Sequence, residues 1–207
     1  MGSDEFYQFN AKVYDVLDRT YFRKAATSPR NAVISILGDE PLMVLDMCTG
    51  TAANAIAIAG ARKYTKVVGI DISDAMLHQA AAKLEQEGIS NVELLHMDAA
   101  NLQFPNEKFD VVLISLVLHE LSPDLAGKLL WEARRVLKTT GKLIVVEWEE
   151  PVSRFKKIPF YLVKKTEPKG FEDFLKCEMN QYFCRFGFEM TRTIHCDYSK
   201  VMISSKK

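Results

Sequence analysis

The chain has 207 residues, of which 48% are apolar and 26% charged, so it can build one globular core of ordinary composition. Its 27 basic residues balance 27 acidic ones, which argues against nucleic acid as a partner. No apolar run reaches the roughly 18 residues of a membrane-spanning helix, so we expect no stable membrane insertion. The first residues, MGSDEFYQF, lack a signal-peptide pattern, and the four cysteines form no C-x-x-C pair. These features favour a cytoplasmic enzyme.

The first segment, residues 5–38, is typical of helices, and Ser28 with Pro29 is expected to begin the second of them. After it, β-rich runs alternate with helical patterns. Strands are expected at 42–47, 66–71, 91–97, 109–117 and 142–148, and helices at 52–62, 73–88 and 122–141. Near-continuous apolar strands separated by helices indicate a parallel sheet covered on both faces.

The C-terminal part departs from this alternation. A helical pattern over 170–186 is followed by strands at 187–196 and 199–206. Two strands that close together must pair as an antiparallel hairpin, because a parallel pair needs a long crossover. The sequence therefore predicts an α/β sheet that is mostly parallel and has an antiparallel strand near one edge.

No repeat or second domain is visible, so residues 1–207 are interpreted as one domain. Residues 1–38 would form an N-terminal helical cap. Residues 151–169 are an irregular, lid-like insertion, in which Pro159 argues against a continuous amphipathic helix.

Three aspartates stand at the ends of three successive strands. Asp46 begins the loop that contains Gly50, Asp71 ends the second strand, and Asp98 follows the third. In an open parallel sheet, ligands bind beyond the carboxyl ends of the strands. One aspartate alone is most often a turn former or a helix cap, but three in one α/β frame favour a shared ligand.

These segments resemble the class I S-adenosylmethionine-dependent methyltransferases. The resemblance rests on VLDMCTGTAANAIAIA, VVGIDISDAMLHQAA, NVELLHMDAANLQF, FDVVLISLVLHEL and RVLKTTGKLIVVEW, over roughly residues 42–150. The sequence is most similar to small-molecule methyltransferases of the ubiquinone/menaquinone biosynthesis type, whose N-terminal A-x-x-Y-D pattern resembles AKVYD here. The resemblance implies a Rossmann-like three-layer sandwich with strand order 3-2-1-4-5-7-6 and strand 7 antiparallel.

The resemblance also implies roles for individual residues in binding S-adenosylmethionine. Asp46 and Gly50 would shape the pocket for its methionine end, and Asp71 would bind the ribose hydroxyls. The other implied contacts are Tyr14 over the cofactor, Ile72 and Met76 on the adenine, Asp98 and Ala99 at the adenine edge, and Ser115 beside the amino-acid moiety.

The first loop departs from the family pattern D-x-G-x-G-x-G, because Cys48 and Ala52 replace the outer two glycines. Alanine is small, whereas the Cys48 side chain must fit where the backbone usually faces the ligand. We expect cofactor binding to be retained and count Cys48 among the cofactor-contacting residues. No partner for a reactive or metal-binding role of Cys48 is visible, and no metal site is expected.

His119 follows the fourth strand and is the candidate general base, since its ordinary pKa lies near neutrality. The alternative is a polar turn before a helix. In the insertion at 151–169, lysines and an arginine alternate with aromatic and aliphatic residues. This composition is typical of a solvated lid, or of a surface patch that binds an anionic or membrane-associated acceptor.

The sequence therefore predicts a methyltransferase that acts on a small molecule by in-line displacement. A nicotinamide-dependent oxidoreductase is disfavoured, since 50-GTAANA-55 is not the required G-x-G-x-x-G. Two alternatives stay open: a degenerate, non-catalytic S-adenosylmethionine-binding regulatory domain, and a lipid- or quinone-precursor methyltransferase working near the membrane. The acceptor atom and the oligomeric state stay open as well.

Overall fold

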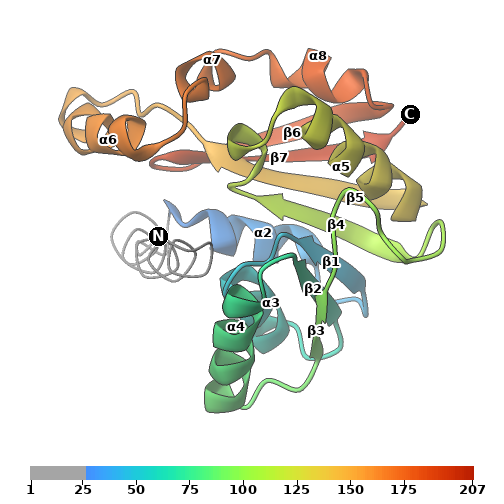
Figure 1. Cartoon of the computed structure of the whole chain (residues 1–207). Helices are drawn as coiled ribbons and strands as arrows, with labels where there is room; N and C mark the ends of the chain where they lie inside the picture. The colour runs from blue at the N-terminus through green and yellow to red at the C-terminus, as the bar shows by residue number, and fades with distance from the viewer. Residues whose placement is uncertain (1–26) are drawn as a thin grey trace.

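Figure 1 shows the computed structural model, which describes residues 27–207. Its centre is a seven-stranded sheet in the order β3-β2-β1-β4-β5-β7-β6. The strands are β1 Met43–Met47, β2 Lys66–Asp71, β3 Val92–His96, β4 Phe109–Ser115, β5 Leu137–Trp148, β6 Phe188–His195 and β7 Ser199–Lys206. Strand β7 is antiparallel to both of its neighbours, and the other pairings are parallel. The expected order and the antiparallel strand are confirmed.

Helices cover both faces of this sheet (Figure 1). They are α2 Pro29–Leu37, α3 Ala53–Ala61, α4 Asp74–Glu87, the 3₁₀ turn η2 Leu118–Glu120, α5 Pro123–Val136, α6 Arg154–Thr166, α7 Phe171–Leu175 and α8 Met179–Cys184. One apolar cluster joins α2, α3 and α4 to one face, and another joins α5 and α8 to the other. The three-layer arrangement is therefore confirmed.

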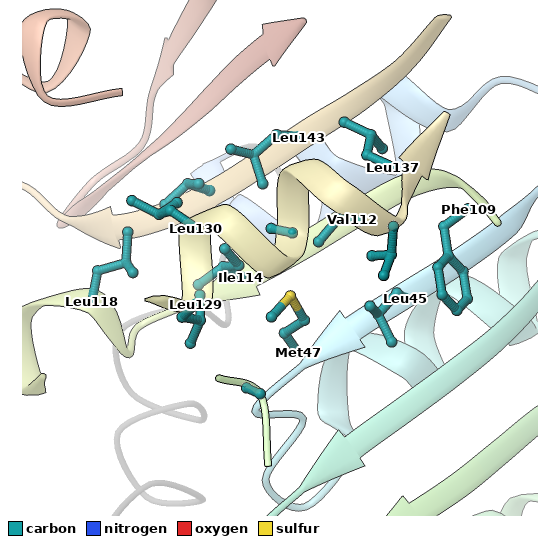
Figure 2. Packing of buried hydrophobic residues seen from close by; sticks show 14 of the residues in the cluster. Leu45, Met47, Phe109, Val112, Ile114, Leu118, Leu129, Leu130, Leu137 and Leu143 are labelled. Carbon is teal, nitrogen blue, oxygen red and sulfur yellow. The ribbon is translucent and has the colours of Figure 1, made fainter. Parts of the chain in front are cut away.

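The alternation of side chains along β1 explains this division. Leu45 and Met47 belong to the cluster under α5, whereas Val44 belongs to the cluster under α2 and α3. Figure 2 shows Leu129 and Leu130 of α5 above Met47 and the neighbouring strand β4. Asp46 alternates with the α5-facing residues, so its side chain lies on the α3 side at the end of β1.

The helix expected over 122–141 ends earlier, at Val136, and residues 137–141 open β5. Phe109 pairs with Leu137 and Val111 with Lys142, so β5 carries extra residues between two pairings. Gly141 is therefore not the helix stop that the sequence suggested. A Cβ there would lie 2.6 Å from the Leu137 side chain, so the position requires glycine for close packing.

The insertion at 151–169 is more regular than expected, because α6 spans most of it and contains Pro159. Proline removes one helical hydrogen bond, but the following turn is anchored by packing. Phe160 and Val163 are buried in a cluster with Trp148 and Phe171. The local sequence pattern did not predict α6, because this helix depends on tertiary packing. The helical pattern at 170–186 also divides, into the short helices α7 and α8.

The helix starts that the sequence predicted from serine caps and proline are confirmed. Ser73 and Ser122 cap α4 and α5 through their side chains, and Pro29 begins α2. Tyr14 and the first expected helix lie outside the described residues. Within residues 27–207, no helix is both long and apolar enough to cross a membrane.

Candidate functional site

The loop after β1 turns through three left-handed residues. Cys48, Gly50 and Ala52 have φ values of 56°, 56° and 60°. These are the three glycine positions of the family pattern, which explains why glycine is preferred at each. A left-handed conformation costs an ordinary residue roughly 1–2 kcal/mol, so Cys48 and Ala52 hold the loop shape against local strain. A Cβ added at Gly50 would meet no atom within 4 Å, so its backbone faces open space.

Asp46 sits beneath this loop with only 1% of its surface exposed. It accepts a 2.6 Å hydrogen bond from Thr49 Oγ1. Burial raises the pKa of Asp46 to about 7, and the negative charge of Asp71 adds to the effect. The carboxyl group is thus poised between its neutral and charged forms and would respond to a cation nearby.

Asp71 fastens the loop to the end of β2. Its Oδ2 accepts from the Gly50 backbone N–H at 2.8 Å, and its Oδ1 accepts from the Ser73 N–H at 2.9 Å. Each carboxylate oxygen can accept a further hydrogen bond, so Asp71 keeps capacity for ligand hydroxyls while it positions the loop. Sequence reasoning found the residue but not this bridging role.

The end of β3 contributes Asp98 and Ala99. Asp98 is exposed and accepts from the Ala100 N–H at 2.8 Å, whereas Ala99 is buried. Next to β2, Ile72 leaves 63% of its surface exposed, and Met76 on α4 is buried. The exposed Ile72 side chain offers an apolar surface to a flat ring.

The charges of several carboxylates act on the thiol of Cys48 in this loop. Burial raises the pKa of its thiol to about 12, and the charges of four carboxylates add to the shift: Asp71, Asp46, Glu120 and Asp98. Asp46, Asp71 and Asp98 therefore all act electrostatically on one half-buried side chain in the loop after β1. Because a nucleophilic or ligating cysteine must be a thiolate, the raised pKa disfavours a reactive role for Cys48.

The end of β4 holds Ser115, which is half-buried, followed by Leu116. Leu116 has φ 54°, a left-handed conformation that a bulky residue rarely adopts, and its N–H donates to the Val146 carbonyl at 2.9 Å. The strand therefore ends earlier than the sequence suggested, since β4 stops at Ser115. Strain of this kind concentrates at ligand sites and switch regions.

His119, in the η2 turn, is buried between two carboxylates. Nδ1 lies 2.6 Å from Glu147 Oε2, and Nε2 lies 3.1 Å from Glu167 Oε2. Glu147 is fully buried in β5, and its other oxygen accepts from the Leu118 N–H at 2.8 Å. The rings of Phe171 and Phe174 pack edge-on against the imidazole.

This pairing changes the chemistry available to His119. Burial alone would lower the pKa of His119, but the Glu147 and Glu167 carboxylates outweigh it and raise it to about 10. Ionised carboxylates only accept hydrogen bonds, so both ring nitrogens donate. The imidazole thus has no free nitrogen with which to take a proton, and this arrangement does not favour a general base.

Sequence reasoning did not find Glu147 or Glu167. Glu147 stands inside the apolar run KLIVVEW, and a glutamate there, on a strand buried on both faces, was the available signal. Glu167 follows α6 and carries no local signal, because only the fold brings it to His119.

The comparisons with known proteins agree with this geometry. A family model described as a methyltransferase domain matches residues 44–141. Demethylmenaquinone methyltransferases of Bacillus cereus and Bacillus anthracis are 37% identical over 150 residues, which is 72% of this chain. The chain spans 62% of the length of these curated relatives.

Solved structures show the same fold at lower sequence identity. A SAM-dependent methyltransferase from Aquifex aeolicus superposes with a TM-score of 0.75 at 21% identity, covering 96% of this chain and 97% of that one. An O-methyltransferase family 2 protein from Planctomyces limnophilus gives 0.74 at 16% identity, covering 100% and 62%. The chain thus matches a methyltransferase domain family over residues 44–141, and it shares its fold with a SAM-dependent methyltransferase of known structure.

Proposed function

We propose that this chain transfers a methyl group from S-adenosylmethionine to a small-molecule acceptor. The observation that carries the proposal is the left-handed loop after β1, to which Asp46 and Asp71 are hydrogen-bonded, with the charge of Asp98 acting on its Cys48. Carboxylates there suit a ligand that bears an ammonium group, two ribose hydroxyls and an adenine amino group.

Individual residues fit this ligand in chemistry. Asp71 would accept from the ribose hydroxyls with its remaining lone pairs, and Asp98 would accept from the adenine amino group. Ile72 and Met76 would pack on the adenine, while the Ala99 N–H would meet the ring edge. The methionine end would lie over Gly50 and Cys48, above Asp46 and beside Ser115, and we extend the same proposal to Tyr14.

The methyl transfer itself requires no covalent bond between the protein and either reactant. Bound S-adenosylmethionine supplies an electrophilic methyl group and a good leaving group. The chain must hold the acceptor in line and exclude water, and such positioning can supply several kcal/mol. We place His119 in a positioning role at the acceptor side, because both of its nitrogens are already paired.

The finer organisation follows from the same proposal. We propose one domain over residues 1–207, in which the cap at 1–38 and the lid at 151–169 close over the strand ends and select the acceptor. A cytoplasmic location and the absence of a nucleic-acid partner fit the balanced charge of the chain.

Isotope transfer tests the activity. Full-length protein is incubated with S-adenosylmethionine labelled in the methyl group and with metabolite and quinone-precursor extracts, and the products are separated by mass. Label in an acceptor supports the proposal. Tight cofactor binding with no transfer to any acceptor would instead indicate a non-catalytic regulatory domain.

A specific surface favours a lipid- or quinone-precursor acceptor reached near a membrane. On and beside α6, large apolar side chains are exposed: Val152 by 96%, Phe155 by 86%, Ile158 by 72%, Leu162 by 64% and Tyr161 by 57%. Lysines flank them, although Lys156, Lys157 and Lys164 also pair with acidic neighbours. Exposed apolar side chains flanked by lysines are typical of helices that bind a membrane interface, which supports this finer proposal.

Sedimentation with anionic vesicles tests this finer proposal. Phe155→Ser together with Ile158→Ser should reduce the bound fraction about tenfold or more, because each side chain contributes roughly 1.5–3 kcal/mol when it is fully buried. Tyr64→Ser, at a 78% exposed aromatic outside α6, serves as the control. Equal binding of the double variant and the wild type would contradict membrane docking by α6.

A further inference from the structure

Three side chains beyond the end of β4 offer ligand atoms to one point. His119 Nε2, a Glu120 carboxylate oxygen and a Glu167 carboxylate oxygen all lie within 4.8 Å of one another. Within this group, Nε2 is 3.1 Å from Glu167 Oε2 and 3.9 Å from Glu120 Oε1. Imidazole nitrogens and carboxylate oxygens are both ligands of catalytic metal sites, and three protein ligands leave a further position open.

The charge of the cluster also favours a cation. Glu147 and Glu167 bring two negative charges to one imidazole, so one negative charge remains among these three side chains when His119 is protonated. The His119 and Glu147 side chains are fully buried, and Glu167 is only 10% exposed. Among residues 27–207, His119 is the only ion-pair partner of Glu147 and of Glu167. Excess buried charge of this kind is costly unless a cation compensates it.

Glu147 accepts a hydrogen bond from the second ring nitrogen of His119, as carboxylates do for histidine ligands in metal sites. Histidine ligands almost always donate their second ring N–H to a carboxylate or a carbonyl, which fixes the ring orientation. Here Nδ1 faces Glu147 at 2.6 Å, and Glu147 is itself held by the Leu118 N–H. Nε2 is thereby turned toward Glu120 and Glu167. A metal ion bound there would displace the Nε2 proton that Glu167 otherwise accepts.

We propose that His119, Glu120 and Glu167 bind a divalent first-row transition-metal ion, with Glu147 as the positioning residue. One nitrogen and two carboxylate oxygens suit Mn²⁺, Fe²⁺ or Zn²⁺ better than Mg²⁺ or Ca²⁺, which prefer oxygen ligands alone. The sequence offered no metal pattern, because Glu167 lies 48 residues from His119.

A role for this ion rests on the proposed methyl transfer. The charge of Glu120 reaches Cys48 in the cofactor loop, so the cluster lies within electrostatic range of the place assigned to the methionine end. A metal-bound acceptor hydroxyl would release its proton to solvent and attack as an oxyanion. The oxygen lone pair forms the new C–O bond, and the electrons of the broken C–S bond stay on sulfur. A metal ion at this site would therefore favour an oxygen nucleophile.

Metal titration of chelator-treated, full-length protein tests the site without any turnover. Calorimetry with Mn²⁺ and with Zn²⁺ should show one saturable site per chain. Glu147→Gln should weaken binding about 10–100-fold, and Glu167→Gln at least as much. Glu172→Gln, at an exposed glutamate of α7, is the matched control and should bind as the wild type does.

Spectroscopy and cofactor binding separate the possible outcomes. Pulsed electron paramagnetic resonance of bound Mn²⁺ should show one imidazole nitrogen coupling, which His119→Gln removes. Absent saturable binding of either ion, or equal affinity in wild type and Glu167→Gln, would overturn the metal site. Titration of the demethylated cofactor into the same proteins is independent, so its failure in the wild type would count against the proposed function and not against the metal site.

Discussion

The two halves of the candidate site, one for the cofactor and one for the acceptor, are held together by different kinds of contact. The cofactor end consists of residues 46–52, Asp71 and Asp98, whose carboxylates accept from backbone N–H groups. Two of these groups lie two residues from the carboxylate that accepts, and the third, on Gly50, lies 21 residues from Asp71. The acceptor end consists of residues 116–120, Glu147 and Glu167. It is held by the side chains of Glu147 and Glu167, which lie 28 and 48 residues from His119 in the sequence. A site made from local turns can be predicted from sequence, whereas one made from long-range buried charge depends on the fold.

The acceptor end should depend most strongly on its buried charges. His119→Gln leaves the fully buried Glu147 without its cation, and breaking a buried ion pair costs about 3–5 kcal/mol. Urea denaturation in the presence of a chelator should show this loss in the free energy of unfolding. The double variant with Glu147→Gln should recover at least half of it, since glutamine can still accept from the Leu118 N–H. A single variant within about 1 kcal/mol of the wild type would contradict this account.

The cofactor end should show a pH dependence that originates at Asp46. Because burial raises the pKa of Asp46 to about 7 in the folded chain from 3.8, the folded state binds more protons between these values. This contribution to stability is present below pH 4 and is lost as the pH rises through 7, by up to about 4 kcal/mol. Denaturation of cofactor-free protein from pH 4 to 8 should show the decline, and Asp46→Asn should flatten it. An identical pH profile in the variant would exclude Asp46 as the source.

The left-handed loop predicts a smaller, position-dependent effect of glycine. Ala52→Gly and Ala57→Gly remove the same methyl group, but only Ala52 has positive φ, whereas Ala57 lies inside α3. Relief of left-handed strain should make Ala52→Gly more stable than Ala57→Gly by about 1–2 kcal/mol. Thermal unfolding of the two variants measures the difference. Equal stabilities would mean that the loop carries no strain at Ala52.

Much of the fold was accessible from the sequence because its signals are local. The apolar strand runs, the serine caps and the close hairpin at 187–206 predict the order of elements and the antiparallel strand, and the structure confirms them. Where tertiary packing decides, the local pattern failed. Phe160 and Val163 keep α6 helical through Pro159, and close packing at Gly141 belongs to a strand and not to a helix end.

The candidate site divides along the same line. Strand-end aspartates and the glycine-like loop positions are visible in the sequence as residue types at fixed spacing. The role of each residue toward the cofactor came from the family resemblance and stays a prediction. His119 was found, but its chemistry was not, because Glu147 and Glu167 decide it from distant segments. The sequence could therefore suggest a base where the structure shows a fully paired imidazole.

Binding of the demethylated cofactor and of its 2′-deoxy analogue tests the central claim most directly. Asp71 also holds the loop, so a loss of affinity in Asp71→Asn alone would be ambiguous. If Asp71 accepts from the ribose, removing the 2′ hydroxyl should weaken binding to the wild type about tenfold or more, since hydrogen bonds to charged groups contribute about 1.5–3 kcal/mol. The same removal should matter little in Asp71→Asn, while exposed Asp74→Asn should behave as the wild type. An equal loss in wild type and Asp71→Asn would contradict the assignment of the cofactor end.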